Sequence, residues 1–147
     1  MPLFKHILLA TDGSAASDHA ATKAVELARG CGARLTAVYV VDPYPYIGVG
    51  ETNPVGLNAY LSAARDHAAE AHARIAALCG DGAAVQMDAL LVEDVAADKG
   101  ILASAGELGA DLVVVGSHGR TGLRRLVMGS VAAKVVAASH VPVLVVP

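Results

Sequence analysis

A glycine-rich segment that follows a run of valines contains the residues best suited to binding chemistry. Leu112–Val115 is apolar at every position, which is typical of a strand buried on both faces. The chain then turns to glycine and polar residues, and a helix is predicted to begin at Gly129-Ser130. Backbone N–H groups in such a loop and at such a helix start can converge on an anion, and glycines permit close approach. We therefore predict a phosphate cradle made of Gly116, Ser117, His118, Gly119, Arg120, Gly129 and Ser130.

A second polar turn, Thr11-Asp12-Gly13-Ser14, follows the short apolar segment His6–Ala10. Asp12 is then expected at the carboxyl end of a strand, where open α/β sheets bind their ligands. The residues leave two interpretations open. Asp12 either belongs to the turn or caps the following helix, or it makes a polar contact to the base or sugar of a ligand. Ser14 or Ser17 can also cap that helix.

The charged side chains of the glycine-rich segment allow more than one role. His118 is a candidate general base or a neutral hydrogen-bond donor in a phosphate loop. Arg120, Arg124 and Arg125 either neutralise phosphates or lie on a solvated surface. Because the segment has no pair of acidic residues, a Mg²⁺ ion would be held by phosphates and waters.

Several common nucleotide and hydrolase motifs are missing from the chain. There is no Gly-x-x-x-x-Gly-Lys-Ser/Thr, which excludes a P-loop, and no Gly-x-Gly-x-x-Gly after the first strand, which argues against a dinucleotide site. There is also no Gly-x-Ser-x-Gly elbow for a hydrolase triad. His67 and His72 lie five residues apart on one predicted helix, a spacing that does not suit a zinc pair, so both are interpreted as surface residues.

Length and composition indicate one globular domain covering residues 1–147. The chain is 54% hydrophobic with a net charge of −3, so a sizeable core is expected and non-specific nucleic-acid binding is not. No apolar run is long enough for a membrane span, and none reads as a signal peptide. Cys31 and Cys79 fit idle thiols in a reducing cytoplasm, where the protein is expected to reside.

The periodicity predicts strands and helices in strict alternation, which indicates a parallel sheet with right-handed crossovers. The long connection before the second helix, residues 44–56, contains Tyr44 and Tyr46, which either cover a base or pack down the loop. The predicted strands are residues 6–10, 34–41, 84–92, 112–115 and 141–146. The predicted helices are residues 15–29, 57–79, 95–108 and 130–139.

The spacing Gly116, two residues, Gly119, nine residues, Gly129-Ser130 closely resembles the nucleotide-binding signature of the universal stress protein family. The resemblance extends from Ile7–Ser14 near the start of the chain to Val141–Val146 at its end. It implies an α/β fold of the adenine nucleotide alpha hydrolase-like type. In this fold a five-stranded parallel sheet has the order 3-2-1-4-5 and helices on both faces.

The same resemblance implies a ligand and a set of contacts. The ligand would be ATP or a related adenine nucleotide, with or without Mg²⁺, and no catalytic residue or protein metal ligand is assigned. Asp12 would contact the ribose or base, and Val40 would offer backbone to the adenine. Val131 would join Gly129 and Ser130 at the outer phosphates. The resemblance also points to a homodimer through the C-terminal strand, and we expect its interface to centre on Val143 and Val145.

Three functions are compatible with these observations. The first is a binding module in stress response or regulation that acts through nucleotide-dependent conformation or partners. The second is a slow ATPase or self-phosphorylating enzyme, which lacks a clear base beyond His118 and lacks a lysine in the loop. The third is a protein that works by dimerisation alone, against which the complete glycine spacing counts.

Overall fold

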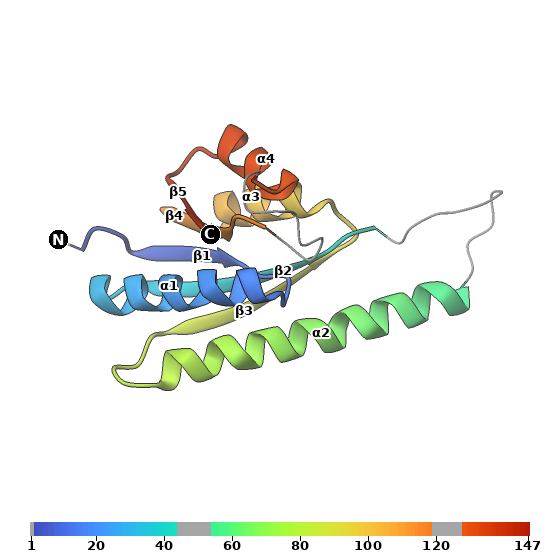
Figure 1. Ribbon diagram of the computed structural model, residues 1–147, viewed down its shortest axis with the longest axis horizontal. Helices are drawn as coiled ribbons and strands as arrows, with labels where there is room; N and C mark the ends of the chain where they lie inside the picture. Colours follow the sequence, from blue (N-terminus) through green and yellow to red (C-terminus); the bar gives the residue numbers. More distant parts are fainter. Residues whose placement is uncertain (1, 44–53, 119–127) are drawn as a thin grey trace.

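The structure is a computed structural model, and it describes residues 2–43, 54–118 and 128–147. In the described part, strands and helices alternate along the chain (Figure 1). The strands are β1 (His6–Ala10), β2 (Arg34–Val41), β3 (Met87–Glu93), β4 (Leu112–Gly116) and β5 (Val143–Val146). The helices are α1 (Ala15–Cys31), α2 (Pro54–Gly80), α3 (Ala97–Leu108) and α4 (Ser130–Ala138).

The five strands form one parallel sheet in the order β3-β2-β1-β4-β5, which confirms the predicted fold class and strand order. β1 lies at the centre, where Leu8 pairs with Thr36 of β2 and with Val113 of β4. β3 and β5 are the two edge strands. No described helix is long and apolar enough to cross a membrane.

Helices cover both faces of the sheet, and alternate residues of the strands divide between the two layers (Figure 1). On one face, Ile7 and Leu9 of β1 pack against α1 and α2. On the other, Leu8 packs in a cluster with residues of α3 and α4 such as Ile101 and Val135. This arrangement leaves β1 and β4 buried on both sides, as their apolar sequences indicate.

The bounds of β1 and β2 agree with the prediction, whereas those of the two edge strands do not. β3 begins at Met87 because Val85 is drawn back to the end of α2, where its N–H donates to the carbonyl of Cys79 at 3.2 Å. β5 begins at Val143 because the Ser139 hydroxyl donates to the carbonyl of Val141 at 2.7 Å and holds that residue in a turn. Short hydrogen-bonded turns thus replace the first residues of both predicted strands.

The side chains of β5 alternate between the two faces in an informative way. Val143 and Val145 are partly buried and pack against the cluster beneath α3 and α4. Leu144 points to the opposite face and is 36% exposed. The apolar side chain that this edge exposes is therefore Leu144, and not Val143 or Val145, on which the predicted interface was centred.

Two glycines of α3 differ in what surrounds them. At Gly106 an added Cβ would meet no atom within 4 Å outside the neighbouring backbone of its own helix. At buried Gly100 it would lie 2.9 Å from both methyl carbons of Val40 on β2. Rotation of the Val40 side chain cannot relieve both contacts. Its two methyl groups fill two of the three staggered positions about χ1, so every rotamer leaves a methyl in at least one of the two positions that face Gly100. Gly100 therefore sets how closely α3 approaches β2.

This difference predicts unequal effects of the same substitution. Gly106→Ala should raise the free energy of unfolding by about 0.5–1 kcal/mol, because alanine restricts the unfolded chain and favours helix. Gly100→Ala should gain less than that or lose stability, because its methyl would press on Val40. Urea unfolding of both variants measures the difference. Equal stabilisation of the two would contradict the close contact between α3 and β2.

Candidate functional site

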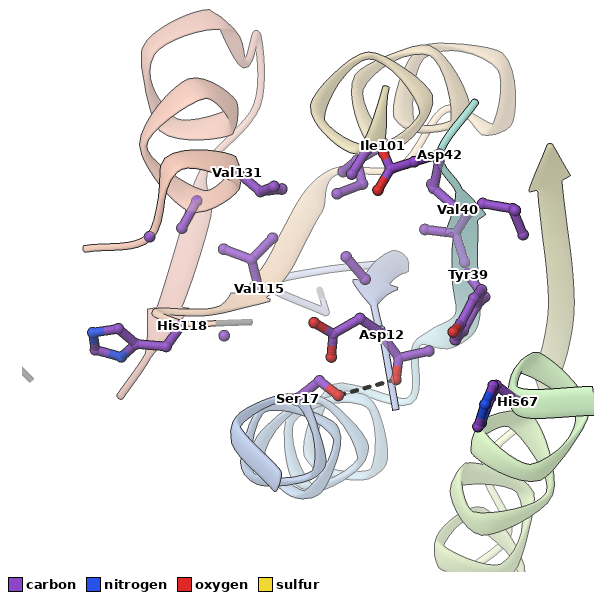
Figure 2. A pocket seen from close by; sticks show the side chains of 18 of the residues that line it. Asp12, Ser17, Tyr39, Val40, Asp42, His67, Ile101, Val115, His118 and Val131 are labelled. Carbon is purple, nitrogen blue, oxygen red and sulfur yellow. Dashed lines mark hydrogen bonds between the residues drawn. The ribbon is translucent and has the colours of Figure 1, made fainter. Parts of the chain in front are cut away.

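A cavity of about 470 Å³ opens at the carboxyl edge of the sheet, between the ends of β1, β2 and β4 (Figure 2). Helices α2, α3 and α4 complete its walls. In the sheet order, β2 lies on one side of β1 and β4 lies on the other. The order of the strands therefore reverses at β1, and the cavity occupies this topological switch point. Ligands of open α/β sheets bind at such a position.

The cavity brings together every predicted site residue that the structure describes. Those residues are Asp12, Val40, Gly116, Ser117, His118, Gly129, Ser130 and Val131. Gly119 and Arg120 were also predicted, and they lie outside the described residues, as do Arg124, Arg125, Tyr44 and Tyr46. Four separated segments of the sequence therefore meet at one place in the fold.

The first end of the cavity is formed by the close contact of the β4 end with the start of α4. The Gly129 N–H donates to the carbonyl of Ser117 at 2.6 Å. A Cβ on Gly129 would lie 3.0 Å from that carbonyl oxygen, and a Cβ on Gly116 would lie 3.2 Å from the carbonyl oxygen of Ala16. Glycine is therefore favoured at both positions, because an added Cβ would push back a backbone carbonyl oxygen by a few tenths of an ångström.

Helix α4 begins at this contact without a side-chain cap. Its N-cap residue is Gly129, which has no side chain to accept from the first amides. Those amides belong to Ser130, Val131 and Ala132, which all line the cavity. The first N–H groups of a helix have no partner within the helix, and together with the helix dipole they attract negative charge. This end of the cavity is suited to an anion.

His118 lies at the same end, at the rim of the cavity (Figure 2). Its Nδ1 is 2.9 Å from the hydroxyl oxygen of Ser117, and that contact fixes the plane of the ring. The contact with Ser117 keeps the imidazole at the rim of the cavity. The geometry is compatible with a hydrogen-bond donor to an anion.

Asp12 projects into the middle of the cavity, between His118 on one side and Val40 on the other (Figure 2). Its Oδ1 accepts from the Ser14 N–H at 2.9 Å, so Asp12 also closes the turn after β1. The helix cap is Ser14, whose hydroxyl oxygen accepts from the Ser17 N–H at 3.2 Å. Asp12 is therefore both a turn residue and a wall of the cavity, and it does not cap α1.

The other end of the cavity is formed by the last residues of β2, which runs further than β1. The Thr11 N–H donates to the carbonyl of Val38, and the Asp94 N–H donates to the carbonyl of Val41. Because successive residues of a strand direct their backbone groups to opposite sides, the N–H and C=O of Val40 point toward β1. β1 ends at Ala10, opposite Val38. In the described part of the chain no strand residue pairs with Val40 on that side, so its donor and acceptor face the cavity.

Sequence reasoning missed the walls that α2 and α3 supply. Tyr60, Ala63, Ala64 and His67 of α2 line the cavity, and Ala97 and Ile101 of α3 cover it from the other side. The Tyr60 hydroxyl donates to the carbonyl of Asp42 at 2.8 Å and ties α2 to the end of β2. The apolar stripe of α2 indicated that this helix packs on the sheet, but nothing in it indicated that one end extends past the strands.

The prediction that both histidines of α2 are surface residues holds for His67 but not for His72. His67 is exposed but faces the cavity (Figure 2). His72 is partly buried, and its Nε2 is 3.0 Å from the carbonyl oxygen of Ala37 on β2. Burial lowers the pKa of His72, and the hydrogen bond to Ala37 opposes that shift. The surface assignment of His72 is therefore wrong, because this histidine connects α2 to the sheet.

The described residues contain no group of three or more His, Cys, Asp or Glu side chains placed to hold a metal ion. Lysine and arginine are likewise missing from the described lining of the cavity. The lining instead combines backbone donors, hydroxyl groups and the carboxylates of Asp12 and Asp42 with the apolar side chains of residues such as Ile101 and Val115. Such a lining suits a flat, partly apolar ligand with an anionic end.

The sequence model of the universal stress protein family matches residues 3–147. The chain belongs to the universal stress protein family. It is 35% identical over 144 residues to the universal stress protein MJ0531 of Methanocaldococcus jannaschii, covering 98% of this chain and 82% of that one. It is 38% identical over 145 residues to a universal stress protein of Thermus aquaticus, covering 98% and 99%.

Solved structures of universal stress proteins are similar over nearly the whole chain. UspA from Lactobacillus plantarum superposes with a TM-score of 0.81 at 26% identity, covering 97% of each chain. A universal stress protein solved in complex with cAMP gives 0.60 at 27% identity, covering 97% and 96%. The Archaeoglobus fulgidus protein in complex with dAMP gives 0.64 at 22% identity, with both chains covered completely, a likeness of fold.

The environment of His72 predicts a pH dependence of stability. Because burial lowers its pKa below the ordinary value of about 6.5, the unfolded state takes up a proton first. At pH values above the ordinary pKa, His72 should therefore not change the free energy of unfolding. As the pH falls below that pKa, His72 should lower the free energy of unfolding. Denaturant unfolding at about pH 7.5 and about pH 5.5 should show a smaller loss in His72→Gln than in the wild type.

His19→Gln is the matched control, because His19 is exposed on α1. This variant should keep the pH dependence of the wild type. If His72→Gln loses as much stability on acidification as the wild type does, the burial of His72 has no energetic consequence and the interpretation is wrong.

Proposed function

We propose that this chain binds an adenine nucleotide, foremost ATP, in the cavity at the carboxyl edge of the sheet. It then acts in stress response or regulation as a nucleotide-dependent binding module. The observation that carries the proposal is the pairing of two features in one cavity. The backbone of Val40 offers a donor and an acceptor at one end, and the uncapped start of α4 faces the other.

The base is assigned to the Val40 end. A backbone C=O can accept from the amino group of adenine while the neighbouring N–H donates to a ring nitrogen, and the apolar Ile101 and Ala97 cover the ring faces. Guanine also carries neighbouring donors and acceptors, so the backbone pair alone does not select adenine. Adenine is favoured because one relative above 25% identity was solved with cAMP.

The phosphates are assigned to the α4 end, where the free amides of the helix and the Ser117–His118 pair provide donors. Asp12 lies between the two ends and is assigned to the sugar, whose hydroxyls can donate to its carboxylate. A Mg²⁺ ion would be held by phosphate oxygens and waters, because the described lining offers no ligand cluster. Gly119 and Arg120 complete the proposed phosphate loop.

A location in the reducing cytoplasm fits the cysteines. Cys31 and Cys79 are both free thiols, and Cys79 is buried. Burial raises the pKa of the Cys79 thiol, although the charge of Arg29 opposes the shift. A thiol with a raised pKa is a poor nucleophile, so Cys79 is assigned a packing role.

Calorimetric titration with ATP and Mg²⁺ tests the proposal. The wild type should bind, and Gly129→Ala should weaken binding by roughly tenfold or more, about 1.4 kcal/mol, because the methyl pushes the start of α4 away from Ser117. Gly106→Ala is the matched control, since its Cβ meets nothing within 4 Å and it lies outside the cavity lining.

The control should bind ATP as the wild type does, and circular dichroism should show that both variants are folded. Absence of ATP binding by the wild type would overturn the proposed function. Unchanged affinity in a folded Gly129→Ala variant would overturn the assignment of the phosphates to α4.

We further propose that the chain forms a homodimer through β5. β5 pairs only with β4 among the described strands, so its outer backbone groups face away from the sheet. An edge with open N–H and C=O groups and an exposed leucine favours pairing, and a twofold dimer covers two such edges at once. The proposed contact is the outer backbone of β5 with Leu144.

The two edges of the sheet provide a matched pair of substitutions. Leu144 on β5 is 36% exposed and Leu91 on β3 is 38% exposed. Leu144→Lys should give a monomer in sedimentation velocity at micromolar concentration, because two lysines would face each other across the twofold axis. Leu91→Lys should remain a dimer. A monomeric wild type, or equal dissociation by both variants, would contradict the β5 interface.

A further inference from the structure

A second cleft, of about 330 Å³, opens beside the main cavity between α2 and the turn that joins β1 to α1. Asp12 and His67 line both spaces, so the two adjoin at these side chains. The turn contributes Gly13 and Ser14 to the cleft, and α2 contributes Glu70 and Arg74. The proposed function leaves this cleft unused.

The proposed orientation of the nucleotide, on which this inference rests, puts the sugar next to the second cleft. If the base lies at Val40 and the phosphates at α4, the sugar spans the middle of the cavity, where Asp12 projects (Figure 2). A carboxylate accepts hydrogen bonds, so the hydroxyl edge of the sugar faces Asp12. The second cleft begins on the other side of that residue. A group attached to a sugar hydroxyl would therefore extend into it.

The charges of the cleft decide which groups it would accept. Arg74 is already engaged, because its Nη2 donates to the carbonyl of Gly13 at 3.1 Å and to Oδ1 of Asp18 at 3.4 Å. Asp18 balances the charge of Arg74. The carboxylate of Glu70 then gives the cleft a negative balance. Such a surface favours a cationic group, accepts a neutral polar one and repels a phosphate.

We propose that the second cleft is a subsite for a neutral or positively charged polar group carried on a sugar hydroxyl of the bound nucleotide. Glu70 is the specificity-determining side chain, because it lines the cleft and lies outside the lining of the main cavity. The ligand class therefore extends to adenine nucleotides substituted at the 2′ or 3′ oxygen, and it excludes those with a phosphate there.

Calorimetry with a series of ATP derivatives tests the subsite. The probes are ATP, ATP with a 2-aminoethylcarbamoyl group on its 2′/3′ oxygen, the same compound with its amine acetylated, and ATP with a 3′-phosphate. The amine should bind at least as tightly as ATP and about threefold or more tighter than its acetylated form. The 3′-phosphate should bind about tenfold or more weakly than ATP.

Substitution of Glu70 separates this charge effect from general binding. Glu70→Gln should bind ATP as the wild type does, and its preference for the amine over the acetylated form should fall to about one. Glu107→Gln is the matched control, because Glu107 is an exposed glutamate of α3 outside both spaces. It should keep the full preference.

The outcomes distinguish the two proposals. If ATP binds and every substituted nucleotide binds tenfold or more weakly, the sugar hydroxyls do not face the cleft and the subsite is overturned. Equal affinity of the amine and its acetylated form in the wild type overturns the role of Glu70. If ATP itself does not bind, the proposed function fails and the subsite fails with it.

Discussion

The site depends on the unequal lengths of neighbouring strands. β2 continues past the last pairing partner that β1 offers it, since Ala10 pairs with Val38 and the Thr11 N–H makes the final bond to β2. Backbone donors and acceptors that are removed from water must find partners, and Val40 has none from β1 in the described chain. The sheet therefore ends in a notch whose wall carries unpaired hydrogen-bonding groups. A bound ligand or water must satisfy them, and the rest of the fold determines what can reach the notch.

The helices fix the shape of that notch through small residues. Ala64, Ala68 and Ala71 let α2 lie close to Tyr39 and Val41 of β2. Gly100 does the same for α3, because the methyls of Val40 occupy the space that a side chain would need. At the third wall, Gly129 brings the start of α4 against the carbonyl of Ser117. Glycine and alanine thus let the helices pack closely against the strands, and the space that remains between these elements is a narrow cavity.

The alternation of strands and helices, and many residues of the candidate cavity, were predicted from the sequence for identifiable physical reasons, whereas the strand order came from the family resemblance. β1 and the second half of β2 are apolar and are followed by turn residues, so the limits of both strands could be read directly. The cradle at Gly116 and Gly129 was predicted because a buried strand that ends in glycine and leads into a helix lets backbone N–H groups converge on an anion. The role assigned to Val40 came from the family resemblance, since a backbone contact leaves no mark on side-chain pattern.

The α2 wall was missed because the part of a helix that passes beyond the sheet is set by packing, which is not a local property. His72 was misassigned for the same reason.

Hydrogen bonds within the protein hold the polar groups of the cavity in place. The Ser14 N–H engages one oxygen of Asp12, and the hydroxyl of Ser17 donates to the carbonyl of Ser14 at 3.0 Å. Buried Thr11 joins this network, with its hydroxyl oxygen 3.2 Å from that of Ser17. At the opposite end, Ser117 positions His118 through its side chain and Gly129 through its carbonyl. Groups fixed in this way lose little conformational entropy when a ligand arrives, which leaves more of the interaction energy for affinity. The same rigidity explains why the glycine contacts matter. A shift of α4 would move the amides of its first turn relative to the other polar groups of the cavity, and those groups are held in place by their own hydrogen bonds.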